Sequence, residues 1–246
     1  TMVLMNVSEF SSVSDATDSM ISALQAFKDE DSDIDTLSKK IIDVYNQIGN
    51  NYAISTSDLA DSLTRSSASL VAANNTLEQS VALTTAANTI TQNPETVGTT
   101  LKTLAMRIRG VKSELEEAGE DTEGMITNTS KLQAKVQALT NVDGSGGVNI
   151  LTNSKEFKST YDILLEISKV WDKMSDVDQA ALLEIIAGKR AGSTVAGILQ
   201  NGDILENSYN DALSANGSAQ KELGIYMDSI QGKLQQLSNS VQTMWT

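Results

Sequence analysis

The sequence NPETVGTTLKTLAMRIRG, residues 93–110, contains the only proline of the chain, at a point where a helix is expected to begin. Asn93 suits the N-cap position, because its side-chain oxygen can accept a hydrogen bond from an unpaired backbone N–H. Pro94 suits the first helical position, where no N–H is needed and the φ angle is already helical. The local sequence therefore predicts a helix that starts at Pro94.

Apolar residues recur every three or four positions after this start, which is typical of an amphipathic helix. Such a helix is marginal alone and needs other helices to pack against. Arg107, Arg109 and Lys112 lie off the apolar stripe, so we expect them to stay in water or to pair with neighbouring carboxylates. The predicted packing face consists of Val97, Leu101, Leu104, Ile108, Val111 and Leu115.

Other segments show the same spacing, and capping residues mark where several of them begin. Ser55, Thr76 and Ser175 each stand three positions before an Asp or a Gln, an arrangement typical of helix N-termini. Gly49 is expected to follow the last residue of its helix. The sequence predicts an all-α fold, a multi-helix antiparallel bundle. Further helices are expected at 20–27, 34–48, 59–70, 76–90, 132–139, 157–171, 180–199 and 217–245.

A glycine-rich segment at 141–153 interrupts this series, with three glycines among the four residues 144–147. So many glycines are unfavourable inside a helix, so we expect a short loop or a small hairpin with a weak strand at 148–151. The predicted organisation is an N-terminal helical region (1–140), the glycine-rich loop or hairpin (141–153), a helical hairpin (154–216) and the start of a coiled-coil helix (217–246).

The C-terminal helix carries the most regular apolar pattern, with three consecutive heptads and no stop signal. We expect this coiled coil to continue beyond residue 246 and to make the chain a homo-oligomer. Its self-association seam is predicted to consist of Leu223, Met227, Ile230, Leu234, Leu237, Val241 and Met244.

The composition argues against several classes of function. The chain has no cysteine and no histidine, so it lacks thiolate metal ligands and the commonest general base. The net charge of −14 argues against binding to nucleic acid or to an anionic membrane surface. There is no run of 18 apolar residues, and no basic segment followed by an apolar one opens the chain. We therefore expect that the chain is not an enzyme and binds no cofactor or metal. We also expect no signal peptide and no stable membrane anchor.

Two segments resemble binding motifs only superficially. The sequence AGKRAGS at 187–193 lacks the glycine and the hydroxyl residue that a phosphate-binding loop places around its lysine. We expect Gly188 and Gly192 to let a neighbouring helix approach closely instead. The acidic residues between Glu114 and Glu123 lack the spacing of a calcium-binding loop, so they are expected to form a solvated surface.

Several strings in this sequence resemble the core region of phage tail tape measure proteins. The resemblance covers roughly residues 10 to 246, and the strings occur in the family's order. They are DLADSLTRSSASL (58–70), the segment 75–110, YDILLEISKVWDKMSD (161–176), QAALLEIIAGKRAG (179–192) and SAQKELGIYMDSIQGKL (218–234).

The resemblance implies a structural role in the tail of a long-tailed phage or a related prophage particle. In that family the helical chain lies in the tail tube, sets the length of the tube and leaves before DNA passes. The implied partners are the tail tube protein, tail assembly chaperones and the tail tip or initiator complex. The implied location is the virion tail, assembled in the host cytoplasm. Some members carry a muralytic enzyme domain, whose residues this segment lacks.

Two other classes of function stay open at the level of sequence. One is a bacterial helical scaffold or toxin-like bundle with a membrane-binding or protein-binding role, in which the apolar helix at 180–199 inserts into membranes. The other is an enzyme that uses lysine, tyrosine or carboxylates. No motif in the sequence supports either class.

Overall fold

The chain is all-α, a helical bundle with one very small sheet. The computed structural model describes residues 12–29, 33–142 and 144–244, and the described part contains twelve helices and two strands. The elements are α2 (Val13–Phe27), α3 (Ile34–Asn51), α4 (Thr56–Ala72), α5 (Leu77–Thr91), α6 (Pro94–Ile108), α7 (Lys112–Glu117), α8 (Thr129–Thr140), β1 (Leu151–Asn153), β2 (Glu156–Phe157), α9 (Thr160–Trp171), α10 (Asp176–Ile186), α11 (Gly188–Gln200), α12 (Gly202–Leu213) and α13 (Ser218–Met244).

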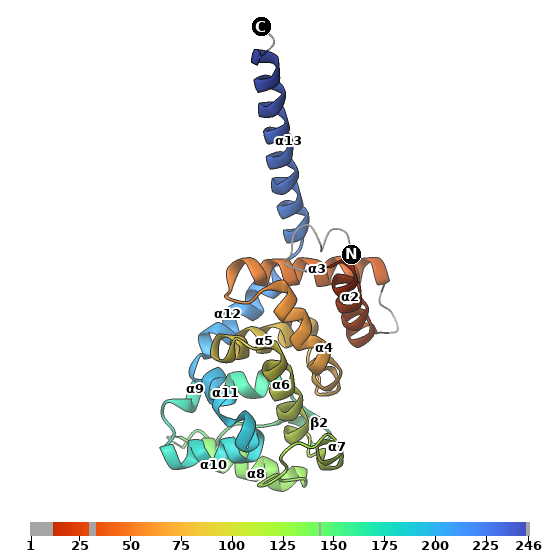
Figure 1. Cartoon of the computed structure of the whole chain (residues 1–246). Coiled ribbons are helices and arrows are strands. Elements are labelled where there is room, and N and C mark those ends of the chain that lie inside the picture. The colour runs from red at the N-terminus through yellow and green to blue at the C-terminus, as the bar shows by residue number, and fades with distance from the viewer. Residues whose placement is uncertain (1–11, 30–32, 143, 245–246) are drawn as a thin grey trace.

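The helices α2 to α12 form a body, and α13 projects away from it (Figure 1). One cluster of buried residues extends through the body from Ala16 to Ala215. Helix α12 returns to the beginning of the chain, because it packs against both α5 and α3. The last helix of the body therefore packs against helices from its N-terminal part, and α3 lies across the base of the projecting helix α13.

The predicted caps define helix starts throughout the body. The side chains of Ser55, Asn93 and Ser175 each accept a hydrogen bond from the backbone N–H three residues later. Thr76 and Gln79 form a reciprocal capping box at the start of α5. These caps satisfy N–H groups that have no partner inside the helix, so each start is fixed locally.

Helix α5 is the centre of the body and is buried on every side from Leu77 to Asn88. Its polar side chains cost little in this position because several hydroxyls donate to the carbonyl one turn earlier. Ser80 donates to the carbonyl of Thr76, and Thr84 donates to that of Ser80. Helices α4, α6, α11 and α12 all pack around α5.

Helices α4 and α6 approach each other closely at Gly98. A Cβ atom at this position would lie 2.7 Å from the carbonyl oxygen of Ser62. The Ser62 hydroxyl also donates to the carbonyl of Pro94 at 3.1 Å. Glycine at position 98 therefore permits α4 and α6 to pack with their backbones close together.

Three predicted boundaries were wrong. The helix expected at 180–199 is broken into α10 and α11 at Gly188, whose φ angle of +74° favours glycine. Gly49 lies inside α3, where it leaves room for Thr56, and does not follow the helix. The packing stripe of α6 crosses a break at Gly110, so Leu115 belongs to the short helix α7.

The strand expected at 148–151 lies later in the chain. Strand β1 begins at Leu151 and pairs antiparallel with β2. The backbone N–H groups of Val148 and Ile150 donate to the side chains of Thr140 and Gln133 on α8. Side chains of a helix thus take the place of a partner strand along this segment.

Candidate assembly interface

Helix α13 is joined to the body through α3. The carboxylate of Asp43 accepts hydrogen bonds from the backbone N–H groups of Gly217 and Ala219, at 2.8 and 3.0 Å. Asn46 donates to the hydroxyl of Ser218 at 2.8 Å. Asp43 therefore caps a helix that lies more than 170 residues away in the sequence. Because these contacts satisfy the first N–H groups of α13, they fix the position from which the helix projects.

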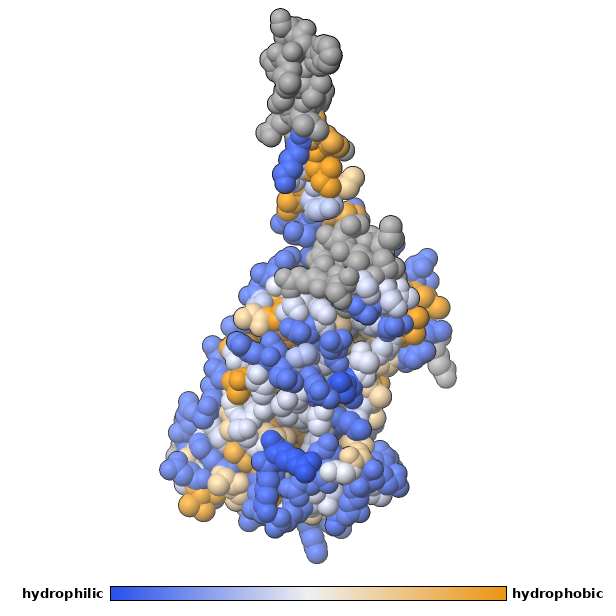
Figure 2. All heavy atoms as spheres, in the orientation of Figure 1, coloured by the Kyte–Doolittle hydropathy of each residue, from blue (hydrophilic) through white to orange (hydrophobic). Residues whose placement is uncertain are grey.

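The predicted seam changes its environment along α13. Leu223 and Ile230 are half-buried, whereas Met227 is 47% exposed and Leu234 is 59% exposed. Figure 2 shows hydrophobic atoms along the described part of this helix, above the body. Because large apolar side chains gather here on a projecting helix, we take α13 as the candidate interface. The side chains of Leu237, Val241 and Met244 lie outside the described residues.

The face opposite the seam also carries one apolar residue. Ile225 is 56% exposed, and its position two residues after Leu223 places it on the far side of the helix. The exposed fractions of Ile225 and Leu234 are nearly equal, so only their position on the helix distinguishes them. This pair offers a matched test of which face binds a partner.

The packing residues predicted on α6 lie in the interior of the body, with one exception. Val111 is half-buried at the break before α7. The buried members contact the common core or, in the case of Leu115, lie in α7 beside α6. They are Val97, Leu101, Leu104, Ile108 and Leu115.

The two glycines predicted to allow close helix packing have different environments. A Cβ atom at Gly188 would lie 3.0 Å from the guanidinium of Arg107, so the close neighbour there is a side chain and not a helix backbone. Among the described residues, a Cβ atom at Gly192 would meet no atom within 4 Å, so the close approach of a helix expected there is absent from this part of the chain. A helix does approach closely at Gly98, which the sequence pattern did not single out.

Arg107 is fully buried, although its place off the apolar stripe predicted exposure. Its guanidinium donates to four backbone carbonyls and not to carboxylates. Two of these carbonyls belong to the last turn of α10 and two to the segment between α7 and α8. Burial lowers the pKa of this guanidinium, while nearby Asp121 and Glu184 oppose the shift. The four carbonyls are those of Asp121, Glu123, Glu184 and Ile185.

This arrangement makes Arg107 the link between three segments of the body. The last carbonyls of a helix lack partners inside that helix, and a cation placed there is favourable with the helix dipole. Five N–H donors on a rigid plane suit several carbonyls at once. Sequence spacing carried no signal for this role, because the nearest acceptor lies 14 residues away and the farthest 78.

Arg109 is half-buried, and it too differs from the prediction of a side chain that stays in water or pairs with a carboxylate. Its guanidinium lies 4.4 Å from the centre of the Phe157 ring and donates to the carbonyl of Lys158 at 3.1 Å. Burial lowers the pKa of Arg109 to about 10. The residue therefore holds the small β-hairpin against the end of α6.

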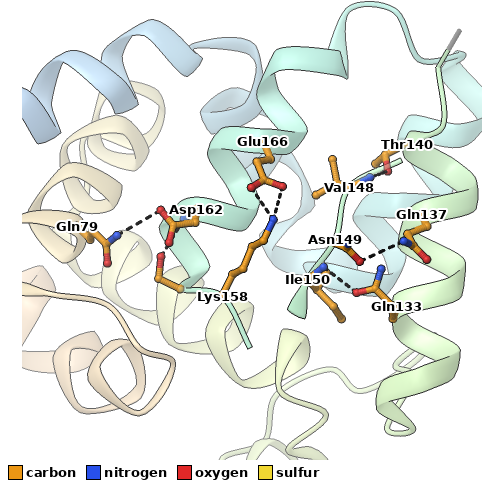
Figure 3. A network of polar contacts seen from close by, with 11 residues as sticks. Gln79, Gln133, Gln137, Thr140, Val148, Asn149, Ile150, Lys158, Asp162 and Glu166 are labelled. Atoms are coloured by element: carbon orange, nitrogen blue, oxygen red, sulfur yellow. Dashed lines mark hydrogen bonds and ion pairs between the residues drawn. The ribbon is translucent and has the colours of Figure 1, made fainter. Parts of the chain in front are cut away.

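A network of polar contacts continues from the hairpin across α8 and α9 (Figure 3). Gln137 donates to Asn149 at 3.1 Å, beside the contacts of α8 with 148–150 described above. Lys158 forms an ion pair with Glu166 at 2.6 Å. Gly147 is required in this region, because a Cβ atom would lie within 2.0 Å of the carbonyl oxygen of Gln137. The network positions the glycine-rich segment on the surface of α8.

The acidic segment before α8 forms local contacts. The backbone N–H of Glu123 donates to Asp121 and lowers the pKa of this carboxyl below its usual range. Lys189 pairs with Glu123, and this hydrogen bond raises the lysine pKa. Among the residues that the structure describes, no group of three acidic side chains is placed to hold a metal ion.

None of the helices that the structure describes combines the length and the apolar character that crossing a membrane requires. The segment 180–199, proposed for membrane insertion in one alternative, is divided at Gly188 and contributes Leu182, Val195 and Ile198 to the core.

The fold defines an all-α protein with a helical body and one helix that projects from it. The sequence model of the family described as phage-related minor tail protein matches residues 1–188. The chain therefore belongs to this family of phage tail proteins. No solved structure was found to match the chain.

Proposed function

We propose that this chain is a segment of a tail tape measure protein, which sets tail length and nucleates assembly of the tail tube. The observation that carries the proposal is the family match over residues 1–188, together with the ordered strings between 58 and 234 that resemble tape measure proteins. A helical body with a projecting amphipathic helix suits such a role. The proposal assigns the chain no catalytic activity.

The proposed partners follow from this role. They are the tail tube protein, the tail assembly chaperones, the tail tip or initiator complex, and further copies of the chain joined through α13. Assembly takes place in the host cytoplasm, and the final location is the virion tail. The division into a helical region (1–140), a glycine-rich loop (141–153), a helical hairpin (154–216) and a coiled-coil start (217–246) is part of the proposal.

Within the tape measure protein, we propose that the body is a folded unit that engages the tip or initiator complex. All of the helices α2 to α12 except α7 contribute to one buried cluster, which supports a packed unit over an extended ruler. An extended helix gains about 1.5 Å per residue, so a ruler shortened by whole turns would shorten the tail in proportion. Helix α13 and coiled coil elsewhere in the protein would then set the length.

Deletion of whole helical turns within 154–200 tests this proposal. The expected result is that tails fail to assemble or assemble wrongly, because the deletion destroys a packed unit. Electron micrographs of phage particles would measure tail length. Normal tails shortened by about 1.5 Å per deleted residue would show that the segment is a plain ruler. A matched insertion of the same number of residues would then lengthen the tail.

A bacterial scaffold or toxin-like bundle that binds membranes or proteins is the alternative. The segment 180–199 would have to leave the core to insert, since Leu182 and Ile198 are fully buried. Co-sedimentation of the whole chain with liposomes of neutral and anionic lipid would support this alternative. The tape measure proposal predicts that the protein stays in the supernatant with both.

A further inference from the structure

Two buried hydroxyl groups of α6 differ from the buried hydroxyls of α5. Thr84 and Thr85 on α5 each donate to the carbonyl one turn earlier. Thr100 and Thr103 on α6 are only 5% exposed, yet within the described part of the chain neither side chain has a hydrogen-bond partner. Neither hydroxyl is fully enclosed by protein atoms. Because an unpaired polar group is costly unless it reaches water or a ligand, both hydroxyls indicate an opening beside α6.

A cavity of about 200 Å³ lies beside these hydroxyls, between α6, α11 and the segment that follows α7. Thr100 and Thr103 stand three positions apart on α6, so they share one face of the helix. Ala187 and Ala191 contribute apolar surface from the start of α11. One water takes about 30 Å³, and pockets for drug-sized ligands begin at about 300 Å³. The cavity therefore suits a group the size of one amino-acid side chain.

The charge of the cavity lining is negative. The lining contains three carboxylates and one guanidinium, so its net charge is −2. Arg190 is exposed, so water screens its positive charge more than it screens the charge of a half-buried group. A cation is therefore favoured over an anion in this cavity. The charged residues of the lining are Glu95, Glu120, Asp121 and Arg190.

One of the three carboxylates, that of Glu120, is left available for a ligand. Glu95 pairs with Arg65 at 3.4 Å. Asp121 accepts a hydrogen bond from the backbone N–H of Glu123 at 2.9 Å. Glu120 is half-buried, and its carboxylate has no ion pair or hydrogen bond with any residue that the structure describes. The cavity thus combines one unpaired carboxylate with two unpaired hydroxyls.

We propose that this cavity binds an alkylammonium group, the group carried by a lysine side chain or by a free alkylamine. An ammonium group has three N–H donors and no acceptor, which matches the carboxylate of Glu120 and the hydroxyls of Thr100 and Thr103. The apolar surface of Ala187 and Ala191 suits the carbon chain. A metal ion fits less well, because no three acidic side chains among the described residues are placed to hold one. The proposal does not rest on the tape measure role, so either can fail without the other.

Titration of the whole chain with n-butylammonium, followed by NMR of the methyl groups, tests the site directly. We expect saturable shifts at the methyl groups of Thr100, Thr103 and Ala191. The control is 1-butanol, which has the same carbon chain without the charge. We expect its dissociation constant to be at least about tenfold larger, the value of one hydrogen bond to a charged group. Equal affinity for the two probes, or no saturable shift at these methyl groups, overturns the proposal.

An acetylated and amidated tripeptide, Ala-Lys-Ala, distinguishes the two sources of the ammonium group. Shifts at the same methyl groups would identify a lysine side chain as the ligand, because the cavity would then admit the group on a polypeptide. Binding of n-butylammonium without binding of the tripeptide would identify a free alkylamine. The tripeptide Ala-Glu-Ala is the control, and its binding in place of Ala-Lys-Ala would overturn the proposal.

Substitutions in the cavity test its carboxylate and its hydroxyls separately. Glu120→Gln should weaken binding of n-butylammonium at least about tenfold, and Thr100→Val should weaken it by roughly tenfold, because each removes a hydrogen bond to a charged group. Thr84→Val is the matched control, since it removes a hydroxyl that is already paired within α5. We expect this control to bind within about twofold of wild type. Circular dichroism would establish that all three variants keep the wild-type helix content. Wild-type affinity in Glu120→Gln or in Thr100→Val contradicts the site.

Arg190 distinguishes an ammonium site from an anion site, because the two predict changes of opposite sign. Arg190→Met removes a positive charge from the lining, so we expect n-butylammonium to bind about twofold or more tightly. At an anion site, Arg190→Met would weaken binding of Ala-Glu-Ala and Glu120→Gln would strengthen it. That second pattern overturns the proposal, and the first supports it.

Discussion

Helices α5 and α13 reverse the usual relation between hydropathy and burial. The hydroxyl-bearing Ser80, Thr84 and Thr85 of α5 are at most 1% exposed, whereas Met227 and Leu234 of α13 are about half exposed. The hydroxyls of α5 donate to carbonyls of their own helix, which removes most of the cost of burying them. The burial of a side chain thus depends on where its helix lies in the fold and not on hydropathy alone. Polar side chains of α5 are buried inside the body, whereas apolar side chains of α13 are exposed.

The largest change in the free energy of unfolding is expected from substituting Arg107 in the interior of the body. Arg107→Met removes the donor to four backbone carbonyls, so the buried carbonyl of Ile185 and three partly buried carbonyls lose this partner. We expect the free energy of unfolding to fall by about 3–5 kcal/mol, the range for breaking a buried charged group away from its partners. Urea unfolding followed by circular dichroism would measure this change.

Arg190→Met is the matched control, because Arg190 is exposed. The expected change there is within about 0.5 kcal/mol. Equal free energies of unfolding for the two variants would mean that the hydrogen bonds of Arg107 do not stabilise the body. The contrast drawn between the polar interior and α13 would then be contradicted.

A smaller effect is expected from adding one methyl group to each region. Gly98→Ala would place its Cβ atom 2.7 Å from the Ser62 carbonyl oxygen in the body. We expect a loss of about 1–3 kcal/mol, because α4 and α6 must move apart. Gly224→Ala on α13 would meet no atom of the described residues within 4 Å and should favour the helix by up to about 1 kcal/mol. Thermal unfolding of both variants checks whether the two signs differ.

The same contrast separates what the sequence could predict from what it could not. The caps at Ser55, Thr76 and Asn93 are confirmed, because each depends on residues within one turn. The burial of Arg107 was missed, since its acceptors come from segments that only the complete fold brings together. The break at Gly188 was missed for the same reason, because the nearby guanidinium has no trace in the local pattern.

For the candidate interface, the spacing of apolar residues identified one face of α13. It did not predict that one end of this face is half-buried while the rest is exposed. The heptad pattern of α13 selects Met227 and Leu234, both exposed, on one side of the helix. It also selects Leu223, which is half-buried at the end that packs on α3. The cap provided by Asp43 could not be predicted, because a carboxylate in the middle of an amphipathic helix is ordinarily solvated.

Asp43 joins the two regions, and its substitution should loosen α13 without unfolding the body. Asp43→Ala removes the acceptor for the N–H groups of Gly217 and Ala219. We expect a loss of about 1 kcal/mol, as for other N-caps. Hydrogen exchange should accelerate at the start of α13 and stay unchanged in α5. Equal acceleration in both helices would show that α13 and the body unfold as one unit.

The smallest effect is expected inside α5 itself. Thr84→Val removes a hydroxyl that donates to the Ser80 carbonyl at 2.8 Å and keeps the shape of the side chain. That carbonyl still accepts the backbone N–H one turn later in the helix, so no buried group loses its only partner. We expect the free energy of unfolding to change by no more than about 0.5–1 kcal/mol, the net value of one such hydrogen bond. Thr84→Asn is the contrasting variant, because its amide would be buried without donors and acceptors arranged to meet it, and it should cost more. Denaturant unfolding of the two variants distinguishes a hydroxyl that is merely tolerated in the core from one on which the core depends. A loss of several kcal/mol in Thr84→Val would establish the second case, and the polar interior of α5 would then be a source of stability to the body.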